Sequence, residues 1–118
     1  VADKDYMELV RRHATAHNIA LIYDEVLSAF RTGPDCAQGY YGVTPDLCVL
    51  GKAVANGGAV VVIAGKKEVM DQVGPLGEVA QSGTFTGNPL AVGSPARLHL
   101  PGVPVAHPVH PLCHHRPD

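Results

Sequence analysis

Two charged residues, each at the end of a short apolar run, are the side chains best suited to chemistry in this chain. Residues 19–23 (IALIY) are followed by Asp24, and residues 47–50 (LCVL) are followed by Gly51 and Lys52. Apolar runs this short, bounded by turn-forming residues, are typical of buried strands in a parallel sheet. Because ligands of open α/β sheets bind at the carboxyl ends of the strands, we expect the acid and the amine at one edge.

A lysine and a carboxylate at such an edge are suited to reactions of carbonyl compounds and amines. A lysine in a buried site loses its proton readily and becomes a nucleophile that can form a Schiff base. A carboxylate can keep the ring nitrogen of a bound cofactor protonated. The sequence therefore makes Lys52 the candidate for a catalytic nucleophile and Asp24 the candidate for holding a cofactor's ring nitrogen.

The elements predicted around these residues make an α/β unit. Residues 5–16 carry apolar side chains at helical spacing, which favours a helix packed on the sheet. A helix, a strand, a connection and a second strand in this order favour parallel pairing. The connection, residues 27–43, is rich in turn-forming residues and is expected to be a loop with one short helical turn. A third strand at 60–64 and a short helix at 66–73 are predicted to follow.

Hydroxyl-bearing residues gather near the end of this unit. Ser82, Thr84 and Thr86 stand close together around Gly83. Side-chain hydroxyls and free backbone N–H groups in one loop are what phosphate binding needs. By itself such a loop is common, and it gains meaning only from the motifs that accompany it.

Four motifs stand together in the order and near the spacing of a known enzyme family. They are residues 21–26 (LIYDEV), 44–47 (TPDL), 50–57 (LGKAVANG) and 81–91 (QSGTFTGNPLA). In this order the chain resembles the class-III aminotransferases, pyridoxal-phosphate enzymes of fold type I, and most of all their glutamate-1-semialdehyde aminomutase-like members. The resemblance covers residues 1–94.

The resemblance implies roles for four residues of this chain. Lys52 corresponds to the Schiff-base lysine and Asp24 to the partner of the pyridinium nitrogen. Val26 corresponds to the residue under the cofactor ring, and Thr84 to a phosphate ligand that reaches into the neighbouring subunit's site. The resemblance thus implies pyridoxal 5'-phosphate as cofactor, a small amino-acid or amino-aldehyde/keto substrate, and a homodimer.

The expected fold is α/β, a fragment of the fold type I large domain with a mostly parallel sheet and flanking helices. At 118 residues the chain is far shorter than the family it resembles, and it begins at Val1, which is consistent with a fragment. Residues 1–94 are expected to be part of the cofactor-binding large domain. Residues 95–118 hold six prolines and five histidines, and this composition predicts a disordered tail that does not match the family.

Composition argues against other classes of partner. The formal net charge of −2 is too nearly balanced to favour nucleic acid or an anionic membrane surface. Residues 59–64, the longest uncharged apolar run, are too few to span a bilayer. Three cysteines without C-x-x-C spacing favour a reducing compartment, so a cytoplasmic location is expected.

Two other classes of function fit part of the sequence. Asp24 and Glu25 after a strand also fit the acidic pair that holds Mg²⁺ in nucleotide-hydrolysing P-loop proteins. That class needs G-x-x-x-x-G-K-[ST], whereas Ala53 follows Lys52 and Asp46 stands in place of the first glycine. A non-catalytic fragment that keeps the motifs without activity is the other alternative.

Other polar residues are given structural roles in preference to chemical ones. Arg31, in the connection, is predicted to be either a ligand of a substrate carboxylate or part of a structural ion pair, the second being favoured. His13 and His17 have metal-ligand spacing on one helical face, but no third ligand stands near them. The residues around Cys113 have metal-ligand types without a second chelating pair. No metal site is predicted.

Overall fold

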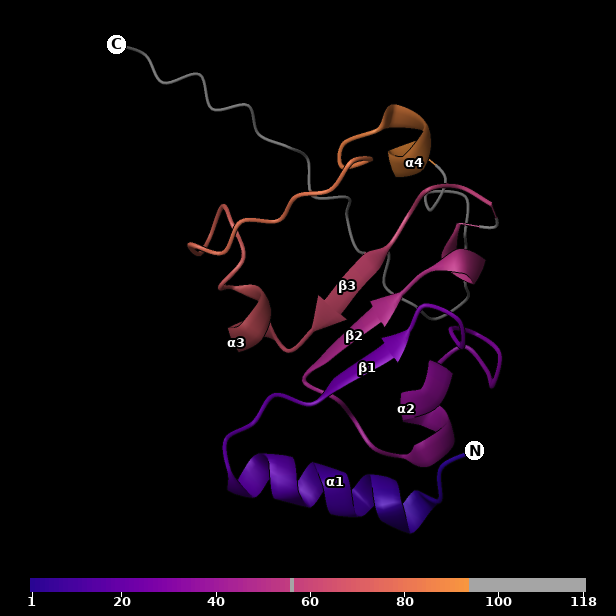
Figure 1. The fold of residues 1–118 in the computed structure, drawn as a ribbon, viewed down its shortest axis with the longest axis vertical. Coiled ribbons are helices and arrows are strands. Elements are labelled where there is room, and N and C mark those ends of the chain that lie inside the picture. Colours follow the sequence, from indigo (N-terminus) through magenta and orange to yellow (C-terminus); the bar gives the residue numbers. More distant parts are fainter. Residues whose placement is uncertain (56, 94–118) are drawn as a thin grey trace.

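The computed structural model describes residues 1–55 and 57–93, which form an α/β unit (Figure 1). The predicted tail at 95–118 and the residues around Cys113 lie outside the described residues. The elements in chain order are α1 (Lys4–Ala16), β1 (Ile22–Glu25), α2 (Cys36–Tyr41), β2 (Leu47–Leu50), the 3-10 helix η1 (Lys52–Val54), β3 (Val62–Gly65), α3 (Lys67–Met70) and α4 (Pro89–Gly93).

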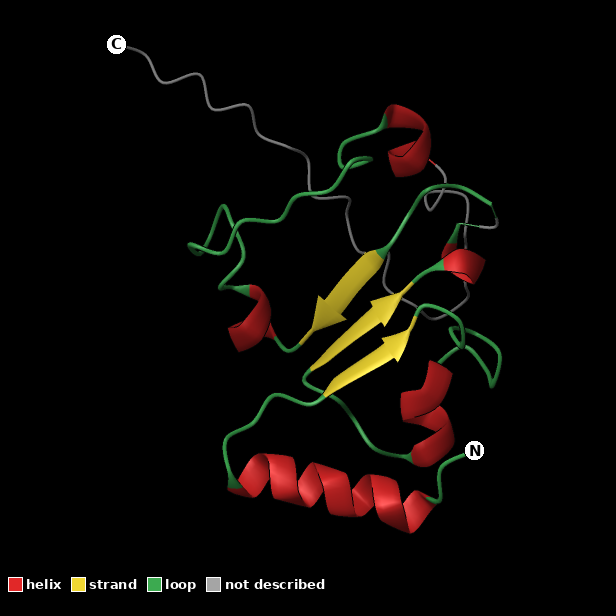
Figure 2. Ribbon diagram, viewed as in Figure 1, coloured by secondary structure: helices red, strands yellow, loops and turns green. Residues whose placement is uncertain are grey.

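The three strands form one mixed sheet in the order β1-β2-β3 (Figure 2). β1 and β2 are parallel as predicted, with Ile22 opposite Leu47 and Glu25 opposite Leu50. β3 runs antiparallel to β2, with Val62 opposite Leu50. A parallel return needs a crossover of about a dozen residues or more, and the chain between β2 and β3 is shorter than that. The α/β class is confirmed, although β3 makes the small sheet mixed.

The first strand begins three residues later than the sequence predicted. α1 is capped by Asp3, whose side chain accepts a hydrogen bond from Asp5 N. At its other end Asn18 takes a left-handed φ of 52°, and the Ile19 N–H donates to the Ala14 carbonyl at 2.8 Å. These contacts turn the chain back toward the sheet. Residues 19–21 form the turn, and β1 starts at Ile22.

The shifted strand places the acidic pair inside β1. Alternate residues of a strand face opposite sides, so Asp24 and Glu25 point to different faces of the sheet. Tyr23 and Glu25 are buried on the side where α2 contacts β1. The opposite face, which carries Ile22, Asp24 and Ile63, is open, and both isoleucines are exposed. Within residues 1–55 and 57–93, no helix has the length and apolar character needed to cross a membrane.

Candidate functional site

The carboxyl ends of β1 and β2 lie side by side (Figure 1). Val26 follows β1, and Gly51 follows β2. A Cβ built on Gly51 would lie 3.0 Å from Cγ1 of Val26, so the two strand ends are in close contact. The absence of a side chain at Gly51 lets the backbone leading to Lys52 approach β1. The structure thus brings Val26 and the segment that carries Lys52 to the same edge of the sheet.

Lys52 has an unusual backbone conformation, and its side-chain amine is unpaired among the described residues. Its φ of 46° lies in the left-handed region, which is uncommon for residues other than glycine and is frequent at functional sites. The side chain is exposed, and in the part of the chain that the structure describes its Nζ has no hydrogen-bond or ion-pair partner. By contrast, Lys66 pairs with Asp46 at 2.6 Å and Lys67 pairs with Asp71. Of these three lysines, Lys52 alone presents a free amine.

Asp24 presents one free carboxylate oxygen at the same edge. Its Oδ1 accepts a hydrogen bond from the Val26 N–H at 3.1 Å, which orients the side chain. Its Oδ2 has no partner among the described residues and is open to a donor from outside. Asp24 lies in register with Val49, three residues before Lys52 on the neighbouring strand. A ring N–H is a donor that this oxygen can accept.

Glu25, the other member of the acidic pair, has a structural role on the buried face. Its side chain is 3% exposed, and Oε2 accepts hydrogen bonds from Ala37 N at 2.9 Å and Ser28 Oγ at 3.4 Å. It therefore holds the first turn of α2 against β1. Because Glu25 is buried and bonded to Ala37 and Ser28, it is not available beside Asp24 for the metal that the nucleotide-hydrolysing alternative requires.

Thr84 lies in an exposed turn that the structure does not join to the strand ends. The turn is closed by hydrogen bonds from Thr86 N to Gly83 O at 3.0 Å and from Asn88 N to Phe85 O at 3.1 Å. Asn88 then caps α4, its Oδ1 accepting from Ala91 N at 3.2 Å. No hydrogen bond among the described residues links this turn to β1 or β2.

Sequence reasoning missed the most heavily bonded carboxylate of the described chain, Asp46. Its side chain is within 2.7 Å of Arg11 Nη1 and 2.6 Å of Lys66 Nζ, and it accepts the Leu21 N–H at 2.7 Å. The hydrogen bond from Leu21, and then those from Lys66 and Arg11, hold the pKa of Asp46 well below its usual range. The signal available in the sequence was an acid directly before a buried strand, with basic residues in the flanking elements.

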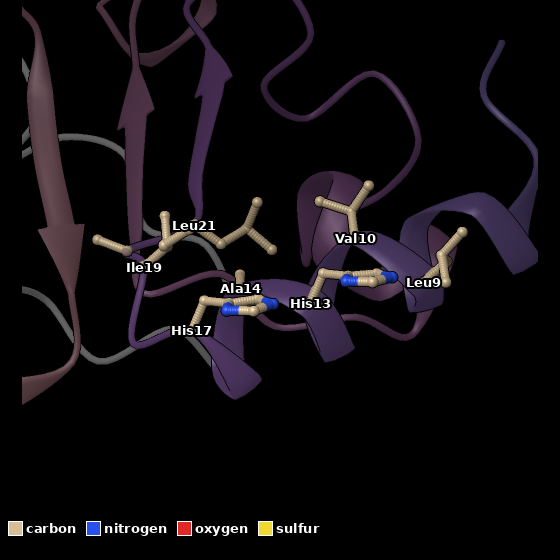
Figure 3. Close-up of a pocket in the computed structure, with 8 residues that line it drawn as sticks. Leu9, Val10, His13, Ala14, His17, Ile19 and Leu21 are labelled. Atoms are coloured by element: carbon tan, nitrogen blue, oxygen red, sulfur yellow. The ribbon is translucent and has the colours of Figure 1, made fainter.

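The structure gives neighbours for Arg31 and for the two histidines. Arg31 Nε donates to the Leu27 carbonyl at 3.2 Å, and Arg31 forms no ion pair with another described residue, so the favoured ion pair is absent there. The rings of His13 and His17 stack 6.2 Å apart on α1, beside a shallow cavity of about 330 Å³ (Figure 3). This cavity is lined by residues that precede β1, at the end of the strand opposite Lys52. In residues 1–55 and 57–93, no group of three or more metal-ligating side chains forms.

The protein-family comparison identifies the family of this chain. The family described as Aminotransferase class-III matches residues 1–95. The chain belongs to the class-III aminotransferases. The resemblance drawn from the four sequence motifs is therefore confirmed, and the P-loop alternative is wrong.

Individual proteins are similar to this chain in sequence or in fold. Glutamate-1-semialdehyde 2,1-aminomutase 1 of Staphylococcus aureus (strain bovine RF122 / ET3-1) is 51% identical over 89 residues, covering 75% of this chain and 21% of that protein. An omega-transaminase from Sphaerobacter thermophilus matches with a TM-score of 0.68 and 36% identity, over 75% of this chain and 21% of the other. A structure described as a transaminase with PLP bound matches with a TM-score of 0.74 and 30% identity, over 85% and 25%. The chain thus spans 21% of the aminomutase it matches.

Proposed function

We propose that this chain is part of a pyridoxal-phosphate-dependent aminotransferase or aminomutase in which Lys52 holds the cofactor covalently. The observation that carries the proposal is the free amine of Lys52, on a left-handed backbone, at the edge shared with Asp24 and Val26. Lys66 and Lys67 are engaged by carboxylates, so neither competes for this role. Membership of the class-III family supports the same assignment.

The residues at this edge fit the ring of pyridoxal phosphate. Asp24 Oδ2 is free to accept a ring N–H, and Val26 offers an apolar side chain next to the backbone that leads to Lys52. When bound, the cofactor supplies an electron sink for bonds at the substrate carbon that carries the amine. Lys52 Nζ would hold the cofactor covalently and would act as the base that moves a proton at that carbon.

The substrate, the partner and the location are inferred with the same function. We propose a small amino acid or an amino-aldehyde or keto compound as substrate, and a homodimer in which Thr84 binds the phosphate of the neighbouring subunit's site. The exposed turn of Thr84, which no described hydrogen bond links to the strand ends, supports that division. The cysteine usage supports a cytoplasmic location. Residues 1–94 are then part of the cofactor domain, and residues 95–118 lie beyond it.

A non-catalytic role is the second candidate, because the chain spans only 21% of the aminomutase it matches. Catalysis requires the phosphate, the ring and the substrate to be fixed to within about half an ångström. Among the described residues, only Asp24, Val26 and Lys52 are proposed to contact the cofactor ring. A chain of this length is then expected to bind the cofactor weakly and to turn over slowly or not at all.

Absorbance spectroscopy with pyridoxal phosphate tests the proposal. Titration of the whole chain should give a visible band that is lost on reduction with borohydride. Lys52→Ala should remove this band, whereas the matched control Lys67→Ala should keep it, because Lys67 is held by Asp71. A band of equal strength in Lys52→Ala would overturn the assignment. An amino-transfer assay on the same samples separates the catalytic candidate from the non-catalytic one.

A further inference from the structure

Asp46 lies at the end of β2 opposite Lys52 and is bonded to α1, to the residue before β1 and to the residue after β3. It directly precedes β2, whereas Lys52 comes two residues after the strand ends. Residue Asp46 is 8% exposed although it carries a charge. A buried carboxylate needs partners to offset its desolvation, and here these partners come from α1, from the segment before β1 and from the segment after β3.

Two hydrogen bonds tie Asp46 to the segment that leads into β1. The Asp46 N–H donates to the Leu21 carbonyl at 2.8 Å, and the Leu21 N–H donates back to Asp46 Oδ2 at 2.7 Å. Leu21 and Asp46 directly precede the first register pair, Ile22 opposite Leu47. The pairing of β1 with β2 is thus extended by one residue, and the Asp46 carboxylate accepts the Leu21 N–H in place of a backbone carbonyl.

Two further bonds tie Asp46 to the residue after β3, and a third joins it to α1. The Lys66 N–H donates to the Asp46 carbonyl at 3.0 Å, while Lys66 Nζ lies 2.6 Å from Oδ1. Arg11 Nη1 lies 2.7 Å from Oδ2, the oxygen that also accepts from Leu21. One side chain therefore fixes both neighbours of β2 at the same end of the sheet.

Register matters in this sheet because each strand has four residues. A slip of β1 by one residue would exchange the faces of its side chains, turning Asp24 to the buried side and Glu25 to the open side. Such a slip would also change which residue of β1 lies beside Gly51. Strands this short have few backbone hydrogen bonds between them to resist a slip. The hydrogen bond from Leu21 to the Asp46 side chain therefore contributes a large share of what holds the register.

We infer that Asp46 is a positioning residue, which sets the register of β1 on β2 and thereby the place of Asp24 relative to Lys52. This inference rests on the proposed function of Asp24 and Lys52. It gives a role to the acid of the TPDL motif, which contacts none of the candidate site residues.

Two substitutions at Asp46 separate its effect on β1 from its effect on the segment after β3. Asp46→Ala removes every side-chain bond. Asp46→Asn can keep its carbonyl oxygen toward Leu21, but its NH₂ group cannot accept from Lys66. Asp71→Asn removes an exposed ion pair elsewhere and is the matched control. Circular dichroism first confirms that each whole chain is folded.

Two measurements then follow register and cofactor capture. Backbone NOEs between the Ile22 and Leu47 segments report register, and borohydride trapping with pyridoxal phosphate reports the fraction of chains labelled on Lys52. We expect Asp46→Ala to lose the native NOEs and about tenfold of the labelling, the effect of losing charged hydrogen bonds. Asp46→Asn should keep the native NOEs and most of the labelling, and Asp71→Asn should match the parent chain in both.

The inference is overturned if Asp46→Ala keeps the native NOEs, whatever its labelling. If Asp46→Ala does not fold, Asp46→Asn decides instead: non-native NOEs between β1 and β2, despite its retained acceptor for Leu21, would overturn the inference. If the parent chain itself takes no label on Lys52, the proposed function fails, and the NOEs still decide whether Asp46 sets the register.

Discussion

Gly51 lies against Val26, with 3.0 Å between the Cβ that Gly51 would carry and Cγ1 of Val26. The contact joins the ends of two parallel strands, one residue before Lys52 and two residues after Asp24. Gly51 has a φ of −148°, a value that any residue adopts. The requirement for glycine here is therefore steric, and it concerns how closely the two halves of the candidate site approach each other.

Gly51→Ala is expected to force the strand ends apart. Val26 must shift by a few tenths of an ångström, and overpacking of this kind costs about 1–3 kcal/mol of unfolding free energy. Urea denaturation measures the loss. The double variant Gly51→Ala with Val26→Ala should recover part of it, since the added methyl group then has room. If the loss of unfolding free energy in the double variant equals the sum of the losses in the two single variants, the contact is contradicted.

Glu25 and Asp24 are expected to respond differently to substitution, although they are neighbours. Glu25→Ala leaves the buried N–H of Ala37 without its acceptor and should cost about 1–3 kcal/mol of unfolding free energy. Asp24→Asn keeps an oxygen for the Val26 N–H and should change stability by less than about 0.5 kcal/mol, while weakening cofactor capture. Urea denaturation and borohydride trapping on the same variants test both statements. A stability loss of the same size at both positions would contradict the separation of faces.

The pH dependence of stability should carry the signature of Asp46. Its pKa is lower in the folded chain than the value of about 3.9 of an unfolded aspartate, so the stabilisation is fully present above that value. As the pH falls below about 4, the unfolded chain binds a proton before the folded one does, and the stabilisation is progressively lost. Unfolding free energies measured from pH 6 to pH 2 should therefore fall more steeply for the parent chain than for Asp46→Asn. Parallel curves would contradict the pairing of Asp46.

The Tyr23 hydroxyl offers a test of the buried face. The residue is 6% exposed, and its hydroxyl has no hydrogen-bond partner among the described residues. Burial, followed by the charge of Glu25, raises the pKa of Tyr23. Tyr23→Phe removes the unpaired hydroxyl and keeps the ring, so stability should stay equal or rise by about 1 kcal/mol. A loss of more than about 1 kcal/mol of unfolding free energy, measured by urea denaturation, would reveal a partner for the hydroxyl.

The local pattern of the sequence was sufficient to find the strands. Residues 47–50 form β2 as predicted, because an apolar run between turn-forming residues has few alternatives. The predicted start of β1 was wrong because the chain reverses direction after α1 at the left-handed Asn18, and residues 19–21 form this turn. The turn is held by the hydrogen bond from Ile19 to Ala14, which the pattern of apolar residues alone does not show.

The structural roles of Glu25 and Asp46 could not be predicted for a related reason. Asp24, Glu25 and Asp46 are all acids at the ends of apolar runs, and the sequence distinguishes them only by family resemblance. Their different roles follow from which side of the sheet each faces and from which bases reach it. Arg11 and Lys66 are 35 and 20 positions away from Asp46 along the chain, so only the fold brings them together.

The site of covalent cofactor attachment tests the central proposal most directly. The whole chain is incubated with pyridoxal phosphate, reduced with borohydride and digested, and the modified lysine is identified by mass spectrometry. We predict the label on Lys52, because Asp46 and Asp71 hold the ammonium groups of Lys66 and Lys67. Label found mainly on Lys66 or Lys67, with Lys52 unmodified, would contradict the proposal that the edge between β1 and β2 is the cofactor site.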